Sequence, residues 1–371
     1  MIVAPPSIEV CTEELENALE DALRRGEPTG CRALLPRIIE SVFTQAERLV
    51  SSYSMLRLAY SVKTNPAPEL LRAAKRVGFL AEVIGPQELE HARTWGFTDD
   101  KLVYNGPYPA RNCAHPPAII FADSIEGFAS AAEHFPRSTV GIRLRPPAVS
   151  SRFGVPFARI DELSEAIRYT ERHEIGVSFH VRPQDYGDYD FLGLAETVAG
   201  YAAELERRSG ALVTIFDAGG GRRPCEFDDE VRRGTFDRLI SLVGDRLEHL
   251  RAIVLEPGQA LATPCEAVIG TILEVRHSQR RVMEIVVDVG FPDLPQVRTF
   301  THRIFHVTGG KPRIARPGHG RILGHTCLEY DVLREDIDLD GCRVGDTIAI
   351  ADAGAYDASM SFPFARGRRC L

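Results

Sequence analysis

The sequence lacks the features that mark several large classes of protein. No apolar run approaches the roughly 20 residues needed to cross a bilayer, and Met1–Pro6 lacks the basic region and long apolar core of a signal peptide. The formal net charge of -8 argues against a general affinity for nucleic acid. The eight cysteines include no C-x-x-C pair, which argues against a structural zinc site and suits a reducing cytoplasm. We therefore expect a cytoplasmic globular protein with no metal and no membrane or nucleic-acid partner.

Strand-like runs alternate with amphipathic helical stretches through most of the 371 residues. The runs are Arg57–Val62, Phe79–Ile84, Lys101–Tyr104, Ala118–Ala122, Thr139–Leu144, Ile175–Val181, Leu212–Phe216 and Ala252–Leu255. The helical stretches between them include Glu69–Val77, Gln87–Trp95, Ser124–Phe135, Ile160–Arg172 and Leu192–Arg208. This alternation predicts parallel strands joined by right-handed crossovers. Eight repeats predict a closed (β/α)8 barrel of the TIM type, with an open doubly wound sheet as the alternative.

The alternation stops near Cys265, and a region of strands without helices follows. Its runs are Ala267–Val275, Val282–Val289, Phe305–Val307, Arg321–Leu333 and Thr347–Ala351, which predict a mostly β domain. We expect three regions: an N-terminal segment at 1–30, containing a helix over Glu13–Arg25, that can pack with the β domain; a barrel at 31–265; and the C-terminal β domain at 266–371.

Polar or ionisable residues recur at the C-terminal end of nearly every predicted barrel strand. They are Lys63, Glu82, Asn105, Asp123, Arg143, Arg145, His180, Asp217 and Glu256. Barrels of this kind carry their chemistry at that end of the strands. Lys63 ends an apolar run, and Asn65-Pro66 follows after Thr64, so a single amine stands at the end of the strand. The alternative is an ordinary lysine in contact with water.

Two further features point to a phosphorylated cofactor with a nitrogen ring. Gly219-Gly220-Gly221 follows the seventh strand, where barrels often bind phosphate through backbone N–H groups, although a plain turn has the same composition. Glu256 ends the eighth strand, and a buried carboxylate there needs a partner: a protonated pyridine nitrogen or a neighbouring arginine. His180 can stack on a flat ring or serve a structural role. Together with Lys63, these residues predict a site for pyridoxal 5'-phosphate.

The motifs together resemble one family from about Tyr60 to Phe364. In order they are Tyr60–Pro66, Ser151–Gly154, Phe179–Val181, Asp217–Gly221, Glu256–Gly258, Thr326-Cys327 with Asp331, and Gly354–Tyr356. The chain resembles the alanine-racemase-fold (fold type III) pyridoxal phosphate decarboxylases, the group that contains diaminopimelate, ornithine and arginine decarboxylases. The resemblance implies an amino-acid carboxy-lyase, with the barrel holding the cofactor.

The resemblance also implies a role for each matching residue. Lys63 is the Schiff-base lysine, His180 stacks on the ring and Glu256 pairs with the pyridine nitrogen. The phosphate contacts are Gly219, Gly220, Gly221 and Tyr356, and the residues around the ring and Lys63 are Glu82, Glu88 and Arg143. Cys327 returns the proton to the α-carbon from the second subunit, which implies a homodimer with shared sites; a buried, inert thiol is the alternative.

Several residues depart from the family pattern. Gln259 stands where an arginine near the phosphate is usual, and Arg182 can compensate for it. Leu328 follows Cys327 where ornithine and diaminopimelate decarboxylases carry an acid for the distal amino group, and an apolar side chain cannot pair with an ammonium. Arg182 and His325 tolerate a carboxylate instead, which points to a conjugated amino acid of a siderophore or antibiotic pathway. Glu329 keeps a diamino-acid substrate open.

Three alternatives to this decarboxylase remain. A racemase or epimerase on the same fold generally pairs the pyridine nitrogen with arginine and uses a tyrosine base, so Glu256 and Cys327 argue against it. A cofactor carrier would lack the β domain at 266–371. A catalytically inactive relative would be consistent with Gln259 and Pro183.

Overall fold

The computed structural model describes residues 10–107, 115–147, 149–181, 191–221, 229–277 and 282–364. The chain divides into two compact units. One consists of Phe43–Gly258 and the other of Met1–Val42 together with Gln259–Leu371. Among the described residues, no helix is long and apolar enough to span a membrane.

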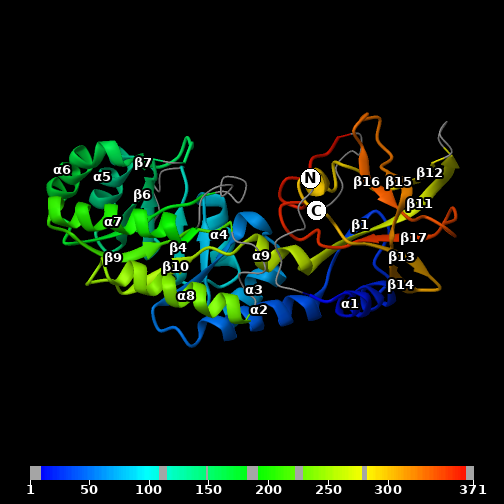
Figure 1. Cartoon of the computed structure of the whole chain (residues 1–371), viewed down its shortest axis with the longest axis horizontal. Helices are drawn as coiled ribbons and strands as arrows, with labels where there is room; N and C mark the ends of the chain where they lie inside the picture. Colours follow the sequence, from blue (N-terminus) through cyan, green and yellow to red (C-terminus); the bar gives the residue numbers. More distant parts are fainter. Residues whose placement is uncertain are drawn as a thin grey trace. The chain divides into compact units, whose positions relative to one another are not determined.

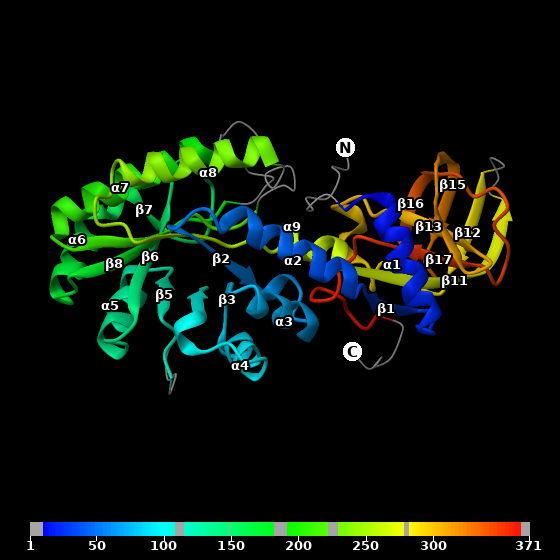
Figure 2. The same ribbon diagram turned by 90° about the horizontal axis from the view of Figure 1, so that it is seen from below.

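The first unit is a closed barrel of parallel strands (Figures 1 and 2). Its strands are β2 (Leu56–Ser61), β3 (Leu80–Val83), β4 (Leu102–Asn105), β5 (Ile119–Ala122), β6 (Thr139–Arg145), β8 (Glu174–Ser178), β9 (Leu212–Asp217) and β10 (Ala252–Leu255). Each pairs in parallel with its neighbours, and the pairings β5–β6 and β10–β2 close the ring. The short β7 (Val155–Pro156) adds to β6. The predicted barrel is confirmed, and the open sheet is excluded by the closing pairs.

Helices lie on the outside of this barrel (Figure 2); the first precedes β2, and the others follow strands of the barrel. They are α2 (Pro36–Val50), α3 (Pro68–Arg76), α4 (Pro86–Thr94), α5 (Ile125–His134), α6 (Ile160–Tyr169), α7 (Phe191–Ser209) and α8 (Asp229–Gly244), with short 3-10 turns at η1 (Val62–Thr64), η2 (Asp99–Lys101) and η3 (Phe157–Arg159). In α3, for example, Leu70, Leu71, Ala73 and Ala74 are buried while Lys75 and Arg76 are exposed. This amphipathic spacing directs one face of the helix towards the sheet.

The barrel interior contains one apolar layer. Ala59, Leu80, Val103, Phe121 and Val254 form a buried cluster. A Cβ at Gly141 would lie 2.6 Å from the Phe121 ring, and one at Gly176 would lie 2.8 Å from it. Phe121 therefore fills the space that two glycines leave on the neighbouring strands, and larger residues there would displace it.

The second unit is mostly β (Figure 1). Its strands, in the order in which they pair, are β14 (Lys311–Ile314), β13 (Ile304–Thr308), β17 (Thr347–Ile350), β11 (Glu266–His277), β12 (Met283–Val287), β15 (Pro317–Leu323) and β16 (Val332–Ile337). All pairs are antiparallel except β12–β15. The buried core includes Ile272, Ile285, Val287, Ile322 and Ile348. The short α9 (Gln259–Ala262), η6 (Thr263–Cys265) and η7 (Pro295–Arg298) complete this unit.

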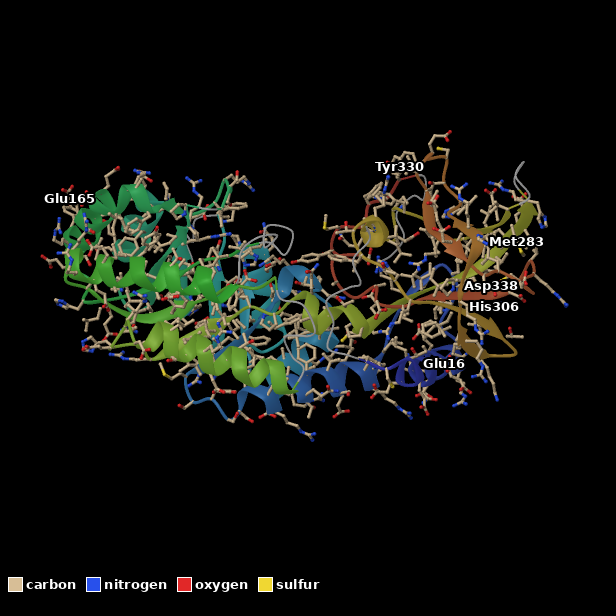
Figure 3. The ribbon with its side chains drawn as sticks, in the orientation of Figure 1. Glu16, Glu165, Met283, His306, Tyr330 and Asp338 are labelled. Carbon is tan, nitrogen blue, oxygen red and sulfur yellow. The ribbon has the colours of Figure 1, made fainter. Side chains whose placement is uncertain are left out.

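N-terminal residues belong to this β unit. β1 (Cys31–Leu34) pairs antiparallel with β11, and α1 (Thr12–Arg24) contacts β14. Glu16 of α1 accepts a hydrogen bond from the Ile314 backbone at 3.3 Å, and Figure 3 shows it beside these strands. The N-terminal segment therefore completes the sheet from its edge.

One predicted strand in this unit is wrong. The sequence predicts a continuous run over Arg321–Leu333, but the chain turns back between β15 and β16. The turn from Gly324 to Asp331 interrupts the run because its polar groups bond within the turn: Gly324 N–H donates to the Asp331 carbonyl at 2.9 Å. Cys327 lies on this turn.

Candidate active site

Polar side chains form a second layer directly above the apolar layer of the barrel. Side chains alternate along a strand, so the residue two positions beyond an inward apolar residue faces inward as well. These polar positions are Ser61, Glu82, Asn105, Asp123, Arg143, Ser178, Asp217 and Glu256. Every barrel strand contributes one of them, so the closed ring gathers residues that are far apart in the sequence.

Lys63 reaches this layer from the turn that follows β2. Its Nζ lies 2.8 Å and 2.6 Å from the two carboxylate oxygens of Glu82. The Lys63 side chain is 26% exposed, whereas Glu82 is fully buried. An amine that is partly exposed on one side and held by a buried acid on the other can meet a ligand in the cavity.

Glu82 has an unusual protonation behaviour. Burial raises its pKa to about 7, against the lowering effect of Lys63 and with a smaller raising effect from the charge of Glu256. The Ser61 hydroxyl donates a hydrogen bond to Glu82 as well. A carboxyl that titrates near neutral pH beside an amine can accept or release a proton under working conditions.

Glu256 is a second buried acid with the opposite behaviour. Asn105 Nδ2 donates to its Oε1 at 2.7 Å, and His180 Nδ1 lies 3.4 Å from its Oε2. Burial by itself raises the pKa of this acid, but His180, Lys63 and Asn105 outweigh burial and lower the pKa to about 2. Glu256 is therefore a charged group beside the cavity and suits a cationic ring nitrogen.

Asp217, on the strand next to Glu256, has a pKa that shifts in the opposite direction. Burial and then the charge of Glu256 raise its pKa well above the usual value. Its Oδ1 accepts the Gly219 N–H at 2.8 Å, while its Oδ2 has no hydrogen-bond partner among the described residues. Burial and the neighbouring charge of Glu256 thus both disfavour the ionised form of Asp217.

The three glycines after β9 adopt a conformation that other residues would strain. Gly219 and Gly221 have φ of 68° and 78°. A Cβ at Gly220 would lie 2.3 Å from the Glu256 carbonyl oxygen, so only glycine fits against that strand. The Gly220 N–H lies 3.1 Å from His180 Nδ1. The loop is thereby held close to both His180 and the end of β10.

Arg143 and Phe153 form another wall of the cavity. Arg143 is largely buried, which lowers its pKa; the charges of Asp123 and Glu256 oppose this. Its guanidinium lies over the Phe153 ring at 5.0 Å and donates to the His180 carbonyl at 3.3 Å. The cavity has a volume of about 560 Å³ and is also lined by Lys63 and Glu256. Its size is within the range of cofactor sites.

The barrel brings together most of the residues that the sequence singles out there. Lys63, Glu82, Arg143, His180 and Glu256 line one cavity. Glu88, on α4, lies outside the lining; its carboxylate accepts the Ile84 N–H at 2.9 Å, and burial raises its pKa. Arg182 lies outside the described residues.

The other predicted residues belong to the β unit. Gln259 begins α9, and Tyr356 has a φ of 64° on a turn after β17. His325, Cys327 and Glu329 are exposed on the turn between β15 and β16, and Leu328 is partly buried there. The exposed Cys327 excludes the alternative of a buried thiol.

Sequence reasoning assigned no role to the hydrogen-bond partners of the two key acids. Asn105 holds Glu256, and Ser61 holds Glu82. Asp217 was noted at a strand end without its relation to Glu256. All three residues lie two positions beyond an inward-facing apolar residue of their strand. This spacing identifies them once the strand bounds are known.

The residues of the cavity fit pyridoxal phosphate. A reactive amine, a buried anion suited to a pyridinium and a glycine loop beside the cavity are its usual protein partners. The fold and this set define a class of barrel enzymes that use a lysine-bound pyridoxal cofactor.

Comparison with known proteins identifies the family. Residues 39–263 match the model of the pyridoxal-dependent decarboxylase, pyridoxal binding domain. The chain is 24% identical over 355 residues to a diaminopimelate decarboxylase of Bacteroides thetaiotaomicron, covering 88% of this chain and 90% of the relative. It is 25% identical over 378 residues to an ornithine decarboxylase of Schizosaccharomyces pombe, covering 95% and 86% respectively.

Solved structures show the same fold. A lysine decarboxylase from Selenomonas ruminantium has a TM-score of 0.76 at 18% identity, covering 97% of this chain and 94% of that one. A diaminopimelate decarboxylase from Helicobacter pylori complexed with L-lysine has a TM-score of 0.76 at 19% identity, covering 93% and 91%. The chain belongs to the pyridoxal-dependent decarboxylases: it is a pyridoxal phosphate-dependent carboxy-lyase that acts in amino-acid metabolism.

Proposed function

We propose that this enzyme removes the α-carboxylate of an amino acid, with Lys63 holding the cofactor and Glu256 pairing with its ring nitrogen. The observation that carries this proposal is that a partly exposed amine and a buried carboxylate anion line the same cavity. When bound, pyridoxal phosphate supplies an electron-withdrawing ring that stabilises the negative charge left by departing CO2.

The surrounding residues bind and orient the cofactor in this proposal. His180 would contact the ring, and the loop Gly219–Gly221 would bind the phosphate together with Tyr356 and Gln259. Arg143 and Glu82 fix the two sides of the cavity. Glu82 also exchanges a proton with the Lys63 amine, which its pKa near 7 and its 2.6 Å contact support.

We propose that Cys327 returns a proton to the α-carbon. Its exposure on a turn supports a role in which the thiol reaches the site of a second copy of the chain. The enzyme then works as a homodimer with shared sites. The described cysteines are free thiols, which supports a cytoplasmic location.

The substrate follows from the residue after Cys327. Leu328 cannot pair with an ammonium, so we propose a substrate whose distal group is a carboxylate, with His325 and Arg182 as its partners. A conjugated amino acid of a siderophore or antibiotic pathway has this form. The second candidate is a diamino acid, such as those named for the relatives, because Glu329 is exposed two residues from Cys327 and can supply the charge.

A substrate panel separates the two candidates. CO2 release is measured with diaminopimelate, ornithine, lysine and arginine on one side and with glutamyl- and citryl-conjugated amino acids on the other. We expect release from the conjugates, and Leu328→Asp to shift the preference towards diamino acids. Release from a diamino acid that Glu329→Gln abolishes would favour the second candidate. Exchange of the α-proton without CO2 release would contradict decarboxylation.

A further inference from the structure

The turn between β15 and β16, from Gly324 to Asp331, separates its side chains by exposure. His325, Cys327 and Glu329 are exposed, whereas Thr326 and Leu328 are partly buried. Asp331, at the end of the turn, is 4% exposed. Figure 3 shows the neighbouring Tyr330 at the outer edge of this unit. Cys327 is therefore exposed on the turn, whereas the Asp331 side chain is buried.

The Asp331 carboxylate accepts three hydrogen bonds. Phe291 N–H donates to Oδ1 at 2.6 Å, Thr326 N–H donates to Oδ2 at 2.9 Å, and the Thr326 hydroxyl donates to the same oxygen. No ion pair among the described residues involves Asp331. The buried carboxyl group is thus held by donors of the turn and of the segment after β12, which joins these two parts of the unit.

The backbone of the turn closes on the same residue. Gly324 N–H donates to the Asp331 carbonyl, and Asp331 N–H donates to the Leu328 carbonyl, both at 2.9 Å. Leu328 N–H lies 3.4 Å from the Thr326 hydroxyl oxygen. Thr326 and Leu328 are both hydrogen-bonded within the turn, and Cys327 lies between them in the sequence. The backbone position of Cys327 therefore depends on the Thr326–Asp331 contact.

Two glycines leave room for the carboxylate. A Cβ at Gly324 would lie 2.1 Å from Asp331 Oδ1, and a Cβ at Gly290 would lie 2.8 Å from Oδ2. Both glycines have backbone conformations that other residues can adopt. Glycine is required there because a side chain would collide with the carboxylate. The pocket around this carboxylate is therefore shaped to hold it in one orientation.

We propose that Asp331 is a positioning residue for Cys327, fixing the turn so that the thiol is presented at one place and in one direction. The catalytic consequence rests on the proposed role of Cys327 as the proton donor. A proton donor acts only within hydrogen-bond reach of the accepting atom, and a displacement of about 1 Å can cost on the order of a hundredfold in rate. Asp331 touches neither substrate nor cofactor and acts through Cys327.

Asparagine at this position tests the charge and the acceptors with little change of shape. An amide has one acceptor oxygen, and its NH2 group would face the N–H of Phe291 or Thr326. We expect Asp331→Asn to lower kcat by about tenfold to a hundredfold with KM changed less than about threefold. Visible absorbance of the bound cofactor should stay unchanged. Thr326→Val, which removes the hydroxyl donor alone, should give a smaller loss in the same direction.

A double-mutant cycle shows whether Asp331 acts through the thiol. In a Cys327→Ala background, Asp331→Asn should lower kcat by less than about twofold, because the positioned group is gone. The matched control is Asp346→Asn, which removes the carboxylate that accepts the Arg343 N–H at 2.9 Å on another turn of the same unit. That control should leave kcat and KM unchanged. An equal loss from Asp331→Asn with and without Cys327 would overturn the proposal.

A readout without turnover separates this proposal from the role of Cys327. The alkylation rate of the Cys327 peptide, followed by mass spectrometry across pH, should change at least about threefold in Asp331→Asn and Thr326→Val but not in Asp346→Asn. If Cys327→Ala keeps full activity while the alkylation rate still responds, the proton-donor role fails and the positioning remains. An unchanged alkylation rate in both variants overturns the positioning, and Thr326→Val decides it if Asp331→Asn does not fold.

Discussion

The barrel unit and the β unit hold their functional side chains in different ways. In the barrel, Glu82 and Asn105 lie on strands that pair with a neighbouring strand on each side. In the β unit, Cys327 and Tyr356 stand on turns, and buried acids hold the turns from within. Asp331 does so for Cys327.

Asp357 plays the corresponding part next to Tyr356. It is fully buried, accepts the Gln296 N–H at 2.8 Å and contacts His302 Nε2 at 2.8 Å. These contacts fix the chain beside Tyr356, whose φ of 64° is costly for a residue with a side chain. The barrel thus carries its candidate functional side chains at strand ends, whereas the β unit carries them on turns that buried acids hold.

The sharpest test of this comparison is Lys63→Ala in the barrel. We expect the visible absorbance of bound cofactor to disappear and activity to fall by at least about a thousandfold, because no second lysine of the described residues lines the cavity. Absorbance spectroscopy and CO2 release measure the two effects. Lys75→Ala, on the exposed face of α3, is the control and should change neither. Full colour in Lys63→Ala would contradict the assignment of the lysine.

The next largest effect is expected from Cys327→Ala in the β unit. We expect kcat to fall by about a hundredfold, the usual contribution of a positioned proton donor, with the cofactor absorbance unchanged. Steady-state kinetics and absorbance on the same samples measure this. Cys31→Ala, at another exposed cysteine of the same unit, should leave both as they are. A loss of cofactor in Cys327→Ala would break the proposed separation between the units.

Stability of the cofactor-free protein should depend on pH through Glu82. Its folded pKa of about 7 lies above the ordinary 4.5, so its contribution is fully present below pH 4.5 and is lost as pH rises through about 7. Each unit of pKa shift corresponds to about 1.4 kcal/mol, which gives an upper bound of about 3 kcal/mol.

Denaturant unfolding of Glu82→Gln at pH 5 and pH 8 tests this dependence. The loss of unfolding free energy between the two pH values should be smaller in the variant than in the natural protein. Glu165→Gln, on the exposed face of α6 and labelled in Figure 3, is the control and should behave as the natural protein does. An identical loss in Glu82→Gln would show that Glu82 does not titrate in this window.

The smallest effect is expected from Ser61→Ala. The Ser61 hydroxyl donates to Glu82 and lowers its pKa, so its removal should cost about 1 kcal/mol at pH 8 and less at pH 5. Thermal unfolding at the two pH values measures the difference. Ser241→Ala, at an exposed serine on α8, serves as the control. An effect of the same size at both pH values would mean that the hydroxyl supports packing rather than the charge of Glu82.

The architecture was largely predictable because it depends on local patterns. Each predicted barrel run overlaps its strand, within a residue or two at most ends, since a buried parallel strand is a short continuous apolar run. β1 and β14 were missed because each has only four residues, too short for a clear pattern: the pairing with β11 and β13 makes them strands. The run at Arg321–Leu333 was misassigned because composition does not show that the polar groups of Thr326 and Asp331 bond to each other.

By itself, the sequence determined the barrel, the identity of the cofactor and the residue types at the strand ends, because periodicity and residue chemistry are local properties. The tertiary structure decided which of those residues act together. Glu82 and Glu256 are both glutamates at strand ends, yet one has a pKa of about 7 and the other of about 2. The reason is physical: burial raises both pKa values and Lys63 lowers both, but only around Glu256 do His180 and Asn105 add to Lys63 and reverse the direction.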